Sequence, residues 1–335
     1  MLEPPAIDYA LIEDCLRDAY GLTAPRAAFL PLGADVNTAV YRVESAEGVY
    51  FFKLRGGDFS PAAVLAPRFF SEQGIRQVIA PLRTRAGELW AALGAYTAVL
   101  APFVAGQDGY SARLDVRQWS EFAAALKAMH AAPVPVELAR MLPREDYSPR
   151  YHLQVRELLR QGLDGPFADA VAEETAGLLL EQRAVIEELL RRADRLAQRL
   201  RSRPGEFVLC HADLHAGNLL IDPGGALFLV DWDTLTLAPR ERDLMYIGAG
   251  LLGGWYSPKE EEALFYPFYG TQQGDAAAVA YYRYERIIQD IAAFSAELLQ
   301  SGVGGEDRPQ SLRFLRSNFQ PGETIDIARR ADPED

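Results

Sequence analysis

Apolar and polar positions follow different spacings in the two parts of the chain. Up to about residue 103, apolar residues come in short runs bounded by turn-forming residues, a pattern that predicts strands. Helical spacing occurs twice in this part, at Ile7–Tyr20 and from Ser60 to about Gln73. The predicted strands are Ala28–Leu32, Ala39–Val43, Val49–Leu54, Ala80–Thr84, Leu89–Leu93 and Tyr96–Phe103. Together they indicate a small antiparallel sheet accompanied by a helix.

After about Gly106, apolar residues recur at helical spacing. The predicted helices are Asp115–His130, one or two helices over Ala168–Arg203, Glu241–Leu252, a helix from the Ser257-Pro-Lys-Glu260 capping box, and Ala276–Leu299. The short polar tail after Pro321 is expected to be frayed. We therefore expect an α+β, bilobal fold, with a small antiparallel β lobe over residues 1–103 and a larger, mostly helical lobe over residues 104–335.

Three short apolar runs interrupt the helical part, and polar residues lie between them. The runs are Val208–Cys210, Leu219–Ile221 and Leu227–Val230. The first two flank the loop His211-Ala-Asp213-Leu-His215-Ala-Gly-Asn218. The last two are joined by an Asp222-Pro-Gly-Gly turn, and Asp231 follows the third run. Because a hairpin of this kind returns the chain, we expect Asp231 to lie beside Asp213 and Asn218.

The side chains of this loop have the chemistry that phosphoryl transfer needs. That reaction requires a carboxylate to orient and deprotonate the acceptor hydroxyl, and oxygen ligands for Mg²⁺. Asp213 suits the first task, while Asn218 and Asp231 suit a hard cation that prefers oxygen. His211 fits a structural role better, because an imidazole two residues before the carboxylate can bond the loop backbone.

Two other interpretations of the same loop are open. The His-x-Asp-x-His spacing also occurs in zinc clusters of metallohydrolases, but the chain has only four histidines, and His130 and His152 lie in helical segments without ligand spacing. Alternatively, an acid and an amide could simply cap a turn between strands. The combination of Asp213, Asn218 and Asp231 in this setting favours phosphoryl transfer over both.

Lys53 stands within the apolar run Val49-Tyr-Phe-Phe-Lys53-Leu, in a chain with only three lysines. An ammonium there is costly unless it meets an anion, and the phosphates of a nucleotide would serve; the alternative is a lysine that points to solvent. The turn carrying Asp35 and Asn37 lies where a phosphate-covering loop is expected. The segment Pro102, Phe103 and Val104 could meet an adenine edge with its backbone.

Composition narrows the possible partners. The net charge of −13 argues against nucleic acid and favours a small cationic substrate. A small polyhydroxyl substrate is the other expected partner. No run approaches the roughly 20 apolar residues of a membrane span, and the amino terminus does not resemble a signal peptide. We therefore expect a cytoplasmic protein with no membrane partner. Cys15 and Cys210 fit reduced, structural thiols, and the sequence leaves the oligomeric state open.

These residues together resemble the aminoglycoside phosphotransferase and choline kinase family, which is related to protein kinases. The resemblance rests on Lys53, on His211-x-Asp213-x-x-x-x-Asn218, and on Val230-Asp231-Trp232-Asp233, and it extends from about Gly33 to Phe294. More narrowly, Phe51-Phe-Lys53-Leu, Ala101-Pro102-Phe103-Val104 and Tyr282-Arg-Tyr-Glu285 are similar to the spectinomycin phosphotransferase branch.

The resemblance implies a protein-kinase-like bilobal fold, ATP and Mg²⁺ as cofactors, and transfer to a hydroxyl of an aminocyclitol or aminoglycoside antibiotic, which would confer resistance. It implies that Asp243 braces the catalytic loop. For a cationic acceptor, Asp233 and Glu285 are the candidate carboxylates. The glutamate that such kinases pair with the strand lysine is not evident, since Glu72 and Asp58 are the only nearby acids.

Two further functions remain open. The loop motif does not encode the acceptor, so the chain could be a metabolic kinase for a small alcohol such as choline, homoserine or a sugar. It could also be a catalytically silent nucleotide-binding module, although the presence of Lys53, Asp213, Asn218 and Asp231 argues against a silent module.

Overall fold

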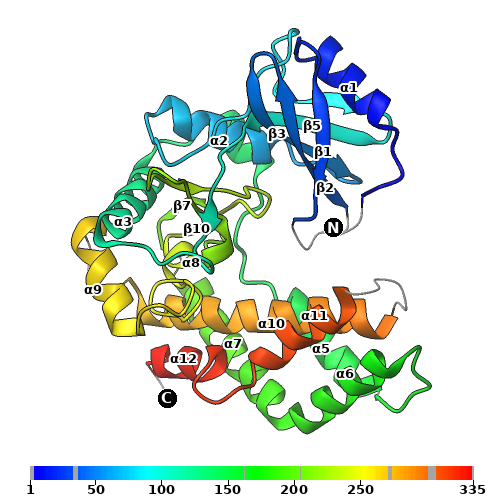
Figure 1. Cartoon of the computed structure of the whole chain (residues 1–335). Coiled ribbons are helices and arrows are strands. Elements are labelled where there is room, and N and C mark those ends of the chain that lie inside the picture. The colour runs from blue at the N-terminus through cyan, green and yellow to red at the C-terminus, as the bar shows by residue number, and fades with distance from the viewer. Residues whose placement is uncertain are drawn as a thin grey trace. The chain divides into compact units, whose positions relative to one another are not determined.

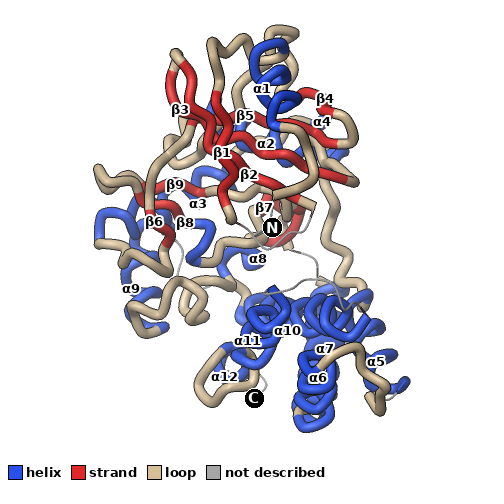
Figure 2. Tube along the Cα trace, turned by 45° about the vertical axis from the view of Figure 1, so that its right-hand side comes forward, coloured by secondary structure: helices blue, strands red, loops and turns tan. Residues whose placement is uncertain are grey.

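The structure is a computed structural model that describes residues 4–32, 37–161, 163–203, 205–270, 274–300 and 307–333. The chain forms two compact units, Met1–Pro143 with His211–Thr236, and Arg144–Cys210 with Leu237–Asp335. The lobe boundary expected at residues 103 and 104 lies within the first unit, and it stays a prediction. The predicted α+β class is confirmed, with a sheet in the first unit and mostly helices in the second (Figures 1 and 2).

A five-stranded sheet forms the amino-terminal part of the first unit. Its strands are β1 (Arg26–Leu30), β2 (Thr38–Ser45), β3 (Gly48–Gly56), β4 (Ala91–Leu93) and β5 (Tyr96–Pro102). Their order is β1-β2-β3-β5-β4, and every neighbouring pair is antiparallel. Lys53 lies opposite Val40 of β2 and Val99 of β5, in the centre of the sheet.

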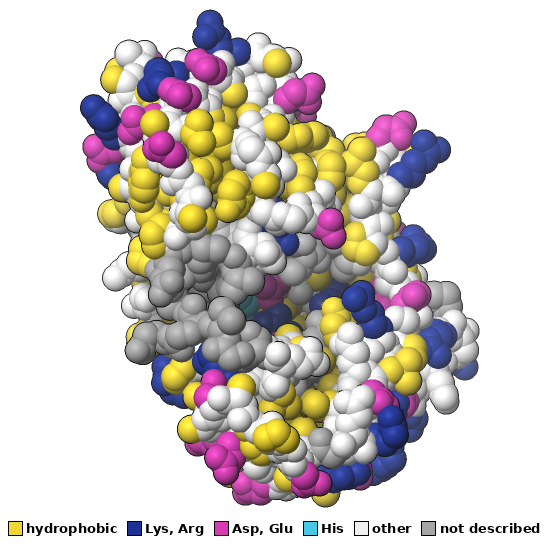
Figure 3. Space-filling model, turned by 90° about the vertical axis from the view of Figure 1, so that its right-hand side faces the viewer, with side chains coloured by type: hydrophobic (Ala, Val, Ile, Leu, Met, Phe, Trp, Pro, Cys, Tyr) yellow, Lys and Arg dark blue, Asp and Glu magenta, His cyan; other side chains and the backbone are white. Residues whose placement is uncertain are grey.

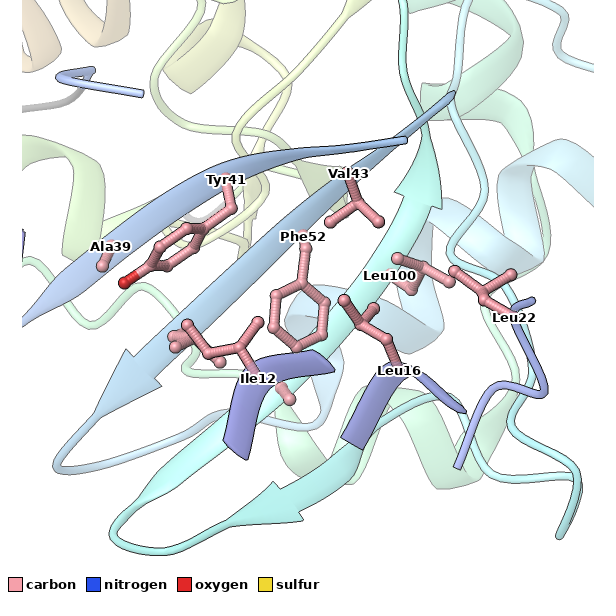
Figure 4. Close-up of a cluster of buried hydrophobic side chains, with 10 residues drawn as sticks. Ile12, Leu16, Leu22, Ala39, Tyr41, Val43, Phe52 and Leu100 are labelled. Atoms are coloured by element: carbon pink, nitrogen blue, oxygen red, sulfur yellow. The ribbon is translucent and has the colours of Figure 1, made fainter. Parts of the chain in front are cut away.

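One face of this sheet is covered by α1 (Tyr9–Asp18). Ile12 and Leu16 of α1 belong to one buried apolar cluster with Tyr41 of β2 and Phe52 of β3 (Figure 4). Side chains alternate between the two faces of a strand. Because Phe52 and its second neighbour Leu54 face α1, Lys53 between them projects from the opposite face of the sheet.

A second, three-stranded sheet in the first unit carries the loop motif. β8 (Leu219–Ile221) pairs with β9 (Leu227–Leu229) and with the short β6 (Gln107–Asp108), both antiparallel. The β8–β9 hairpin closes at the predicted turn, where Gly225 N–H donates to Asp222 O at 2.9 Å. Besides α1, this unit contains the α-helices α2 (Ala62–Glu72), α3 (Val116–Ala131) and α4 (Val136–Met141).

The second unit is built around one long helix, α10 (Ala276–Gln300), which contacts most of its other helices. The contacting helices are α5 (Arg150–Gln161), α6 (Ala170–Glu181), α7 (Arg183–Ser202), α8 (Glu241–Leu244), α11 (Asp307–Ser317) and α12 (Thr324–Ala331). The predicted capping box at Ser257 and Glu260 is confirmed at the start of α9 (Pro258–Tyr269). Strands β7 (Phe207–Cys210) and β10 (Thr236–Pro239) form a two-stranded sheet.

Three predicted segments differ in the structure. Ala80–Thr84 is not a strand, because its only backbone bonds to neighbouring segments are isolated ones such as Leu82 N–H to Leu100 O at 2.8 Å. The helix predicted over Glu241–Leu252 ends at Leu244, and left-handed Gly248 and Gly250 follow (φ +71° and +73°). The tail expected to fray contains α12, which is ordered because its apolar face is buried.

The surface carries charges of both signs. On the face that Figure 3 shows, Lys and Arg side chains occur together with Asp and Glu side chains. None of the helices in the described ranges combines the length and apolar character that crossing a membrane requires.

Candidate active site

Asp213 and Asn218 are fixed to each other within the first unit. The Asn218 side-chain amide donates from Nδ2 to the backbone oxygen of Asp213 at 2.7 Å, and Nδ2 lies 3.4 Å from Asp213 Oδ2. Because the amide nitrogen is turned toward Asp213, the amide oxygen of Asn218 is the atom directed away from it. That oxygen is available as a ligand for a hard cation.

His211 fastens the loop to the segment before Asp231. Its imidazole is fully buried, packs on Trp232 with 4.7 Å between ring centres, and donates from Nε2 to Val230 O at 3.0 Å. The backbone oxygen of His211 accepts from Thr234 Oγ1 at 2.8 Å. This geometry fits the structural role predicted for His211.

Asp231 follows β9 as the hairpin predicts, and the backbone holds it near Asn218. Val230 N–H donates to Asn218 O at 3.1 Å, so the residue before Asp231 adjoins the candidate amide ligand directly. The Asp231 side chain is 53% exposed. A carboxylate and an amide oxygen from adjoining segments form the donor set that Mg²⁺ prefers, and the rest of its coordination shell can be water and phosphate.

Lys53 meets two carboxylates from this same segment. Its Nζ lies 2.7 Å from Asp233 Oδ2 and 3.5 Å from Asp231 Oδ1. Arg55, two residues further along β3, also lies 3.3 Å from Asp233 Oδ2. Burial lowers the pKa of Lys53, but the charges of Asp231 and Asp233 outweigh it and raise that pKa above its ordinary value. Lys53 is therefore a charged, half-buried ammonium that faces the candidate metal ligands.

The acid that pairs with Lys53 is one that the sequence did not indicate. Glu72, considered for that role, pairs instead with Arg68 of its own helix at 2.6 Å, and Asp58 is exposed. Asp233 is the partner, although it lies 180 residues away in the sequence. Arg55 was also missed; its signal was the spacing of two from Lys53, which places both cations on one face of a strand.

The remaining nucleotide-binding predictions concern two segments. Asp35 lies outside the described residues, whereas Asn37 is exposed and its backbone oxygen accepts from Gly56 N–H at 2.8 Å. Phe103, after β5 and between Pro102 and Val104, donates its N–H to Val49 O at 3.2 Å, and the Arg42 guanidinium lies 5.5 Å from its ring centre. Nucleotide contacts by these residues stay predictions.

Glu285 and Asp243 lie in the second unit, and both are buried. Glu285 Oε2 lies 2.7 Å from His152 Nε2, and Asp194 Oδ1 lies 2.6 Å from His152 Nδ1. Burial lowers the pKa of His152, but its hydrogen bonds to the two carboxylates outweigh this and raise it. Glu285 thus stabilises a buried histidine in this structure. Its contact with an acceptor stays a prediction, as does the bracing role of Asp243.

The zinc interpretation of the loop is disfavoured by the bonds of its two imidazoles. His211 uses Nε2 on the Val230 backbone, and His215 Nδ1 accepts from Gly217 N–H at 3.0 Å. Each ring therefore uses one nitrogen to shape the loop itself. An oxygen-rich site at Asn218 and Asp231 describes the donor groups better than a histidine cluster does.

Comparisons with known proteins address the family and the fold of the chain. A sequence model described as the phosphotransferase enzyme family matches residues 28–285. No curated protein gives a significant sequence match. The crystal structure of spectinomycin phosphotransferase, APH(9)-Ia, in complex with ADP and spectinomycin is similar at 30% identity and a TM-score of 0.90, covering 97% of this chain and 99% of that chain.

Two further solved structures are similar. The AMP-bound complex of spectinomycin phosphotransferase matches at 29% identity and a TM-score of 0.85, covering 96% of this chain and 98% of that chain. A microcompartment-associated aminopropanol kinase matches at 16% identity and a TM-score of 0.63, covering 96% and 97%; this likeness shows the fold alone. The predicted kinase-like fold, with an antiparallel sheet and a helical carboxy-terminal part, is thereby confirmed.

Proposed function

Because the chain belongs to the phosphotransferase enzyme family, we propose that it transfers the γ-phosphate of ATP to a hydroxyl of an aminocyclitol antibiotic such as spectinomycin. The choice of acceptor is supported by the similarity to spectinomycin phosphotransferase, which extends over almost the full length of both chains. Such an activity would make a cell that carries the protein resistant to the antibiotic.

Lys53 and Arg55 bind the phosphates of ATP in this proposal. Both cations project from one face of β3 toward Asp233, and a nucleotide polyphosphate offers them a more highly charged partner than a single carboxylate. The relatives solved with ADP and AMP support a nucleotide at this site. Replacement of Asp233 by phosphate releases its carboxylate for an ammonium group of the acceptor.

Asn218 and Asp231 hold Mg²⁺ through the amide oxygen and the carboxylate. The donor set fits the ion, because both groups are hard oxygen ligands and the amide nitrogen is turned toward Asp213. When bound, the ion neutralises charge on the phosphates and helps to orient them.

Asp213 orients the acceptor hydroxyl and takes its proton. The acceptor oxygen forms a bond to the γ-phosphorus, the bond from that phosphorus to the oxygen of the β-phosphate breaks, and ADP leaves. The hydroxyl proton passes to the Asp213 carboxylate, which Asn218 and the loop backbone hold in place. The chain supplies positioning and charge, which are the main contributions that this reaction asks of a protein.

The acidic balance of the chain suits a cationic acceptor. A net charge of −13 raises the local concentration of an aminocyclitol, whose amines are protonated near neutral pH. Asp233 and Glu285 are the carboxylates that we assign to those amines. Asp233 belongs to the same unit as Asp213.

A coupled assay of ADP release tests the proposal. The protein is incubated with ATP and Mg²⁺ and with spectinomycin, other aminoglycosides, choline, homoserine, aminopropanol or simple sugars in parallel. We expect the highest kcat/KM with spectinomycin or a close aminocyclitol. A clear preference for a small alcohol would make the antibiotic assignment wrong and leave the phosphotransferase class intact. Tight ATP binding without ADP release for any acceptor would instead indicate a silent module.

A further inference from the structure

His215, two residues after the proposed base, lies against Asp213 in a defined orientation. Its Nδ1 accepts from Gly217 N–H at 3.0 Å, so that this nitrogen carries no hydrogen. In a neutral imidazole the hydrogen must then be on Nε2. Nε2 lies 3.6 Å from Asp213 Oδ2. The ring therefore presents an N–H group toward the carboxylate, slightly beyond hydrogen-bond distance before any ligand binds.

Neighbouring groups restrain this ring from turning. Tyr110 stacks on it with 6.0 Å between ring centres and 27° between planes. The segment that carries Tyr110 is itself attached to the loop, because Gly109 N–H donates to Ala216 O at 2.9 Å. A Cβ atom at Gly217 would lie only 2.8 Å from His215 Cε1. The glycine thus permits a close contact that any other residue would disturb.

Accepting a hydrogen bond from the backbone N–H of Gly217 does not by itself require a histidine. Ser, Thr, Asp or Asn accept from a backbone N–H at the start of a helical turn equally well. An imidazole differs from these residues because it accepts at one end and donates at the other. In this loop the donating end faces the carboxylate that takes the acceptor proton.

We propose that His215 is a positioning residue, which accepts from Gly217 N–H at Nδ1 and donates from Nε2 to Asp213, and so fixes the carboxylate oxygens for the acceptor hydroxyl. The inference rests on the proposed phosphotransferase function. His215 keeps its own proton throughout the reaction, and the acceptor proton goes to Asp213. Substrate binding closes the 3.6 Å separation to a hydrogen bond.

Two variants test the acceptor role of His215 Nδ1 and the donor role of Nε2 separately. His215→Asn keeps an acceptor near the position of Nδ1 and removes the group that reaches Asp213. His215→Gln carries an amide N–H that can reach Asp213 but lacks the short cap. We expect His215→Asn to lower kcat roughly 10- to 100-fold, the cost of a misplaced reacting group, with KM for ATP and the melting temperature unchanged. His215→Gln should recover much of the turnover despite a lower melting temperature.

Ring nitrogen NMR supplies a measurement that does not depend on activity. The chain has only four histidines, so the His215 signals can be assigned by their loss in His215→Asn. We expect the Nε2–H tautomer in the wild type and, with nucleotide and acceptor bound so that the hydrogen bond to Asp213 is formed, a change at Nε2 but not at Nδ1 in Asp213→Ala. A ring protonated on Nδ1, or an Nε2 signal that does not respond to Asp213→Ala, would overturn the inference.

The kinetic outcomes distinguish this inference from the function on which it rests. An active wild type with reduced kcat in His215→Asn and recovery in His215→Gln supports it. An active wild type with unchanged turnover in His215→Asn overturns it and leaves the proposed function standing. A wild type that transfers phosphate to no acceptor overturns the proposed function, and the role of His215 with it.

Discussion

Ala212 and Asp231, two residues of the site, have left-handed backbone conformations, with φ of +68° and +64°. This conformation costs an L-residue about 1–2 kcal/mol, and it persists only where surrounding contacts enforce it. The enforcing contacts are the bonds from His211 to Val230 and from Thr234 to His211. The strained residues are therefore the one directly before Asp213 and Asp231 itself.

Asp231→Ala tests the assignment of the metal ligand. We expect the affinity for ATP in the presence of Mg²⁺ to fall by about tenfold or more, because one of two protein oxygen ligands is lost. Affinity for ATP without Mg²⁺ should change far less. Calorimetric titration with and without the ion measures both. Asp58→Asn, which alters an exposed acid of the same unit, is the control and should bind as the wild type does. Equal Mg²⁺ dependence in Asp231→Ala and wild type would remove Asp231 from the metal site.

The candidate site could be read from the sequence where its residues are close along the chain. Asp213, Asn218 and Asp231 lie within one strand-loop-hairpin segment, so local turn chemistry was enough to place them together. The partner of Lys53 could not be read in this way, because Asp233 is far from it in sequence and Glu72 and Asp58 are closer. Likewise, the orientation of the His215 ring depends on Tyr110 from another segment.

Among the helices and strands, prediction succeeded where the apolar spacing agreed with clear start and stop residues. β8 was placed at the observed residues, and α9 begins at its capping box. Prediction failed for α12, whose apolar face is buried and which is followed by Asp332, a buried carboxylate that pairs with Arg192 and Arg195 of α7 at 3.3 and 3.1 Å. A short polar sequence does not reveal such tertiary contacts. β6 and β10 were also missed.

Glu261 makes α9 sensitive to pH. Its carboxyl group is buried, and Gly248 N–H donates to Oε2 at 2.8 Å. Burial raises the pKa of Glu261 to about 7 in the folded protein, against about 4.5 when it is exposed. The folded state therefore binds this proton more tightly than the unfolded state. The contribution of this difference to the free energy of unfolding is fully present below pH 4.5 and is lost as the pH rises through 7.

Glu261→Gln tests this linkage. The substitution keeps the size of the side chain and an acceptor for Gly248 N–H, but it removes the titrating group. Between pH 5 and pH 8.5, the free energy of unfolding of the wild type should fall relative to that of the variant by about 2–3 kcal/mol. Urea unfolding at the two pH values measures the difference. Glu181→Gln, at an exposed position of α6, is the control. Parallel pH profiles for wild type and Glu261→Gln would show that Glu261 does not titrate in this range.

The candidate site residues come from segments that are far apart in the sequence but belong to one unit. Lys53 and Arg55 come from the amino-terminal sheet, and the segment from His211 to Thr236 joins that unit although helices of the second unit precede and follow it in sequence. The spacing of apolar residues alone places this segment in the mostly helical part of the chain. The family match shows that the chain is a phosphotransferase, and the family motif does not specify the side chains that select the acceptor.

Mass spectrometry of spectinomycin tests whether this chain phosphorylates it through Asp213. The antibiotic is incubated with ATP, Mg²⁺ and either the wild type or Asp213→Asn. We predict a product heavier by one phosphoryl group with the wild type, and a rate of formation about 10² to 10⁴ times lower with Asp213→Asn, whose affinity for ATP is retained. Unmodified spectinomycin after incubation with the wild type, or equal rates for the two proteins, would contradict the proposed function.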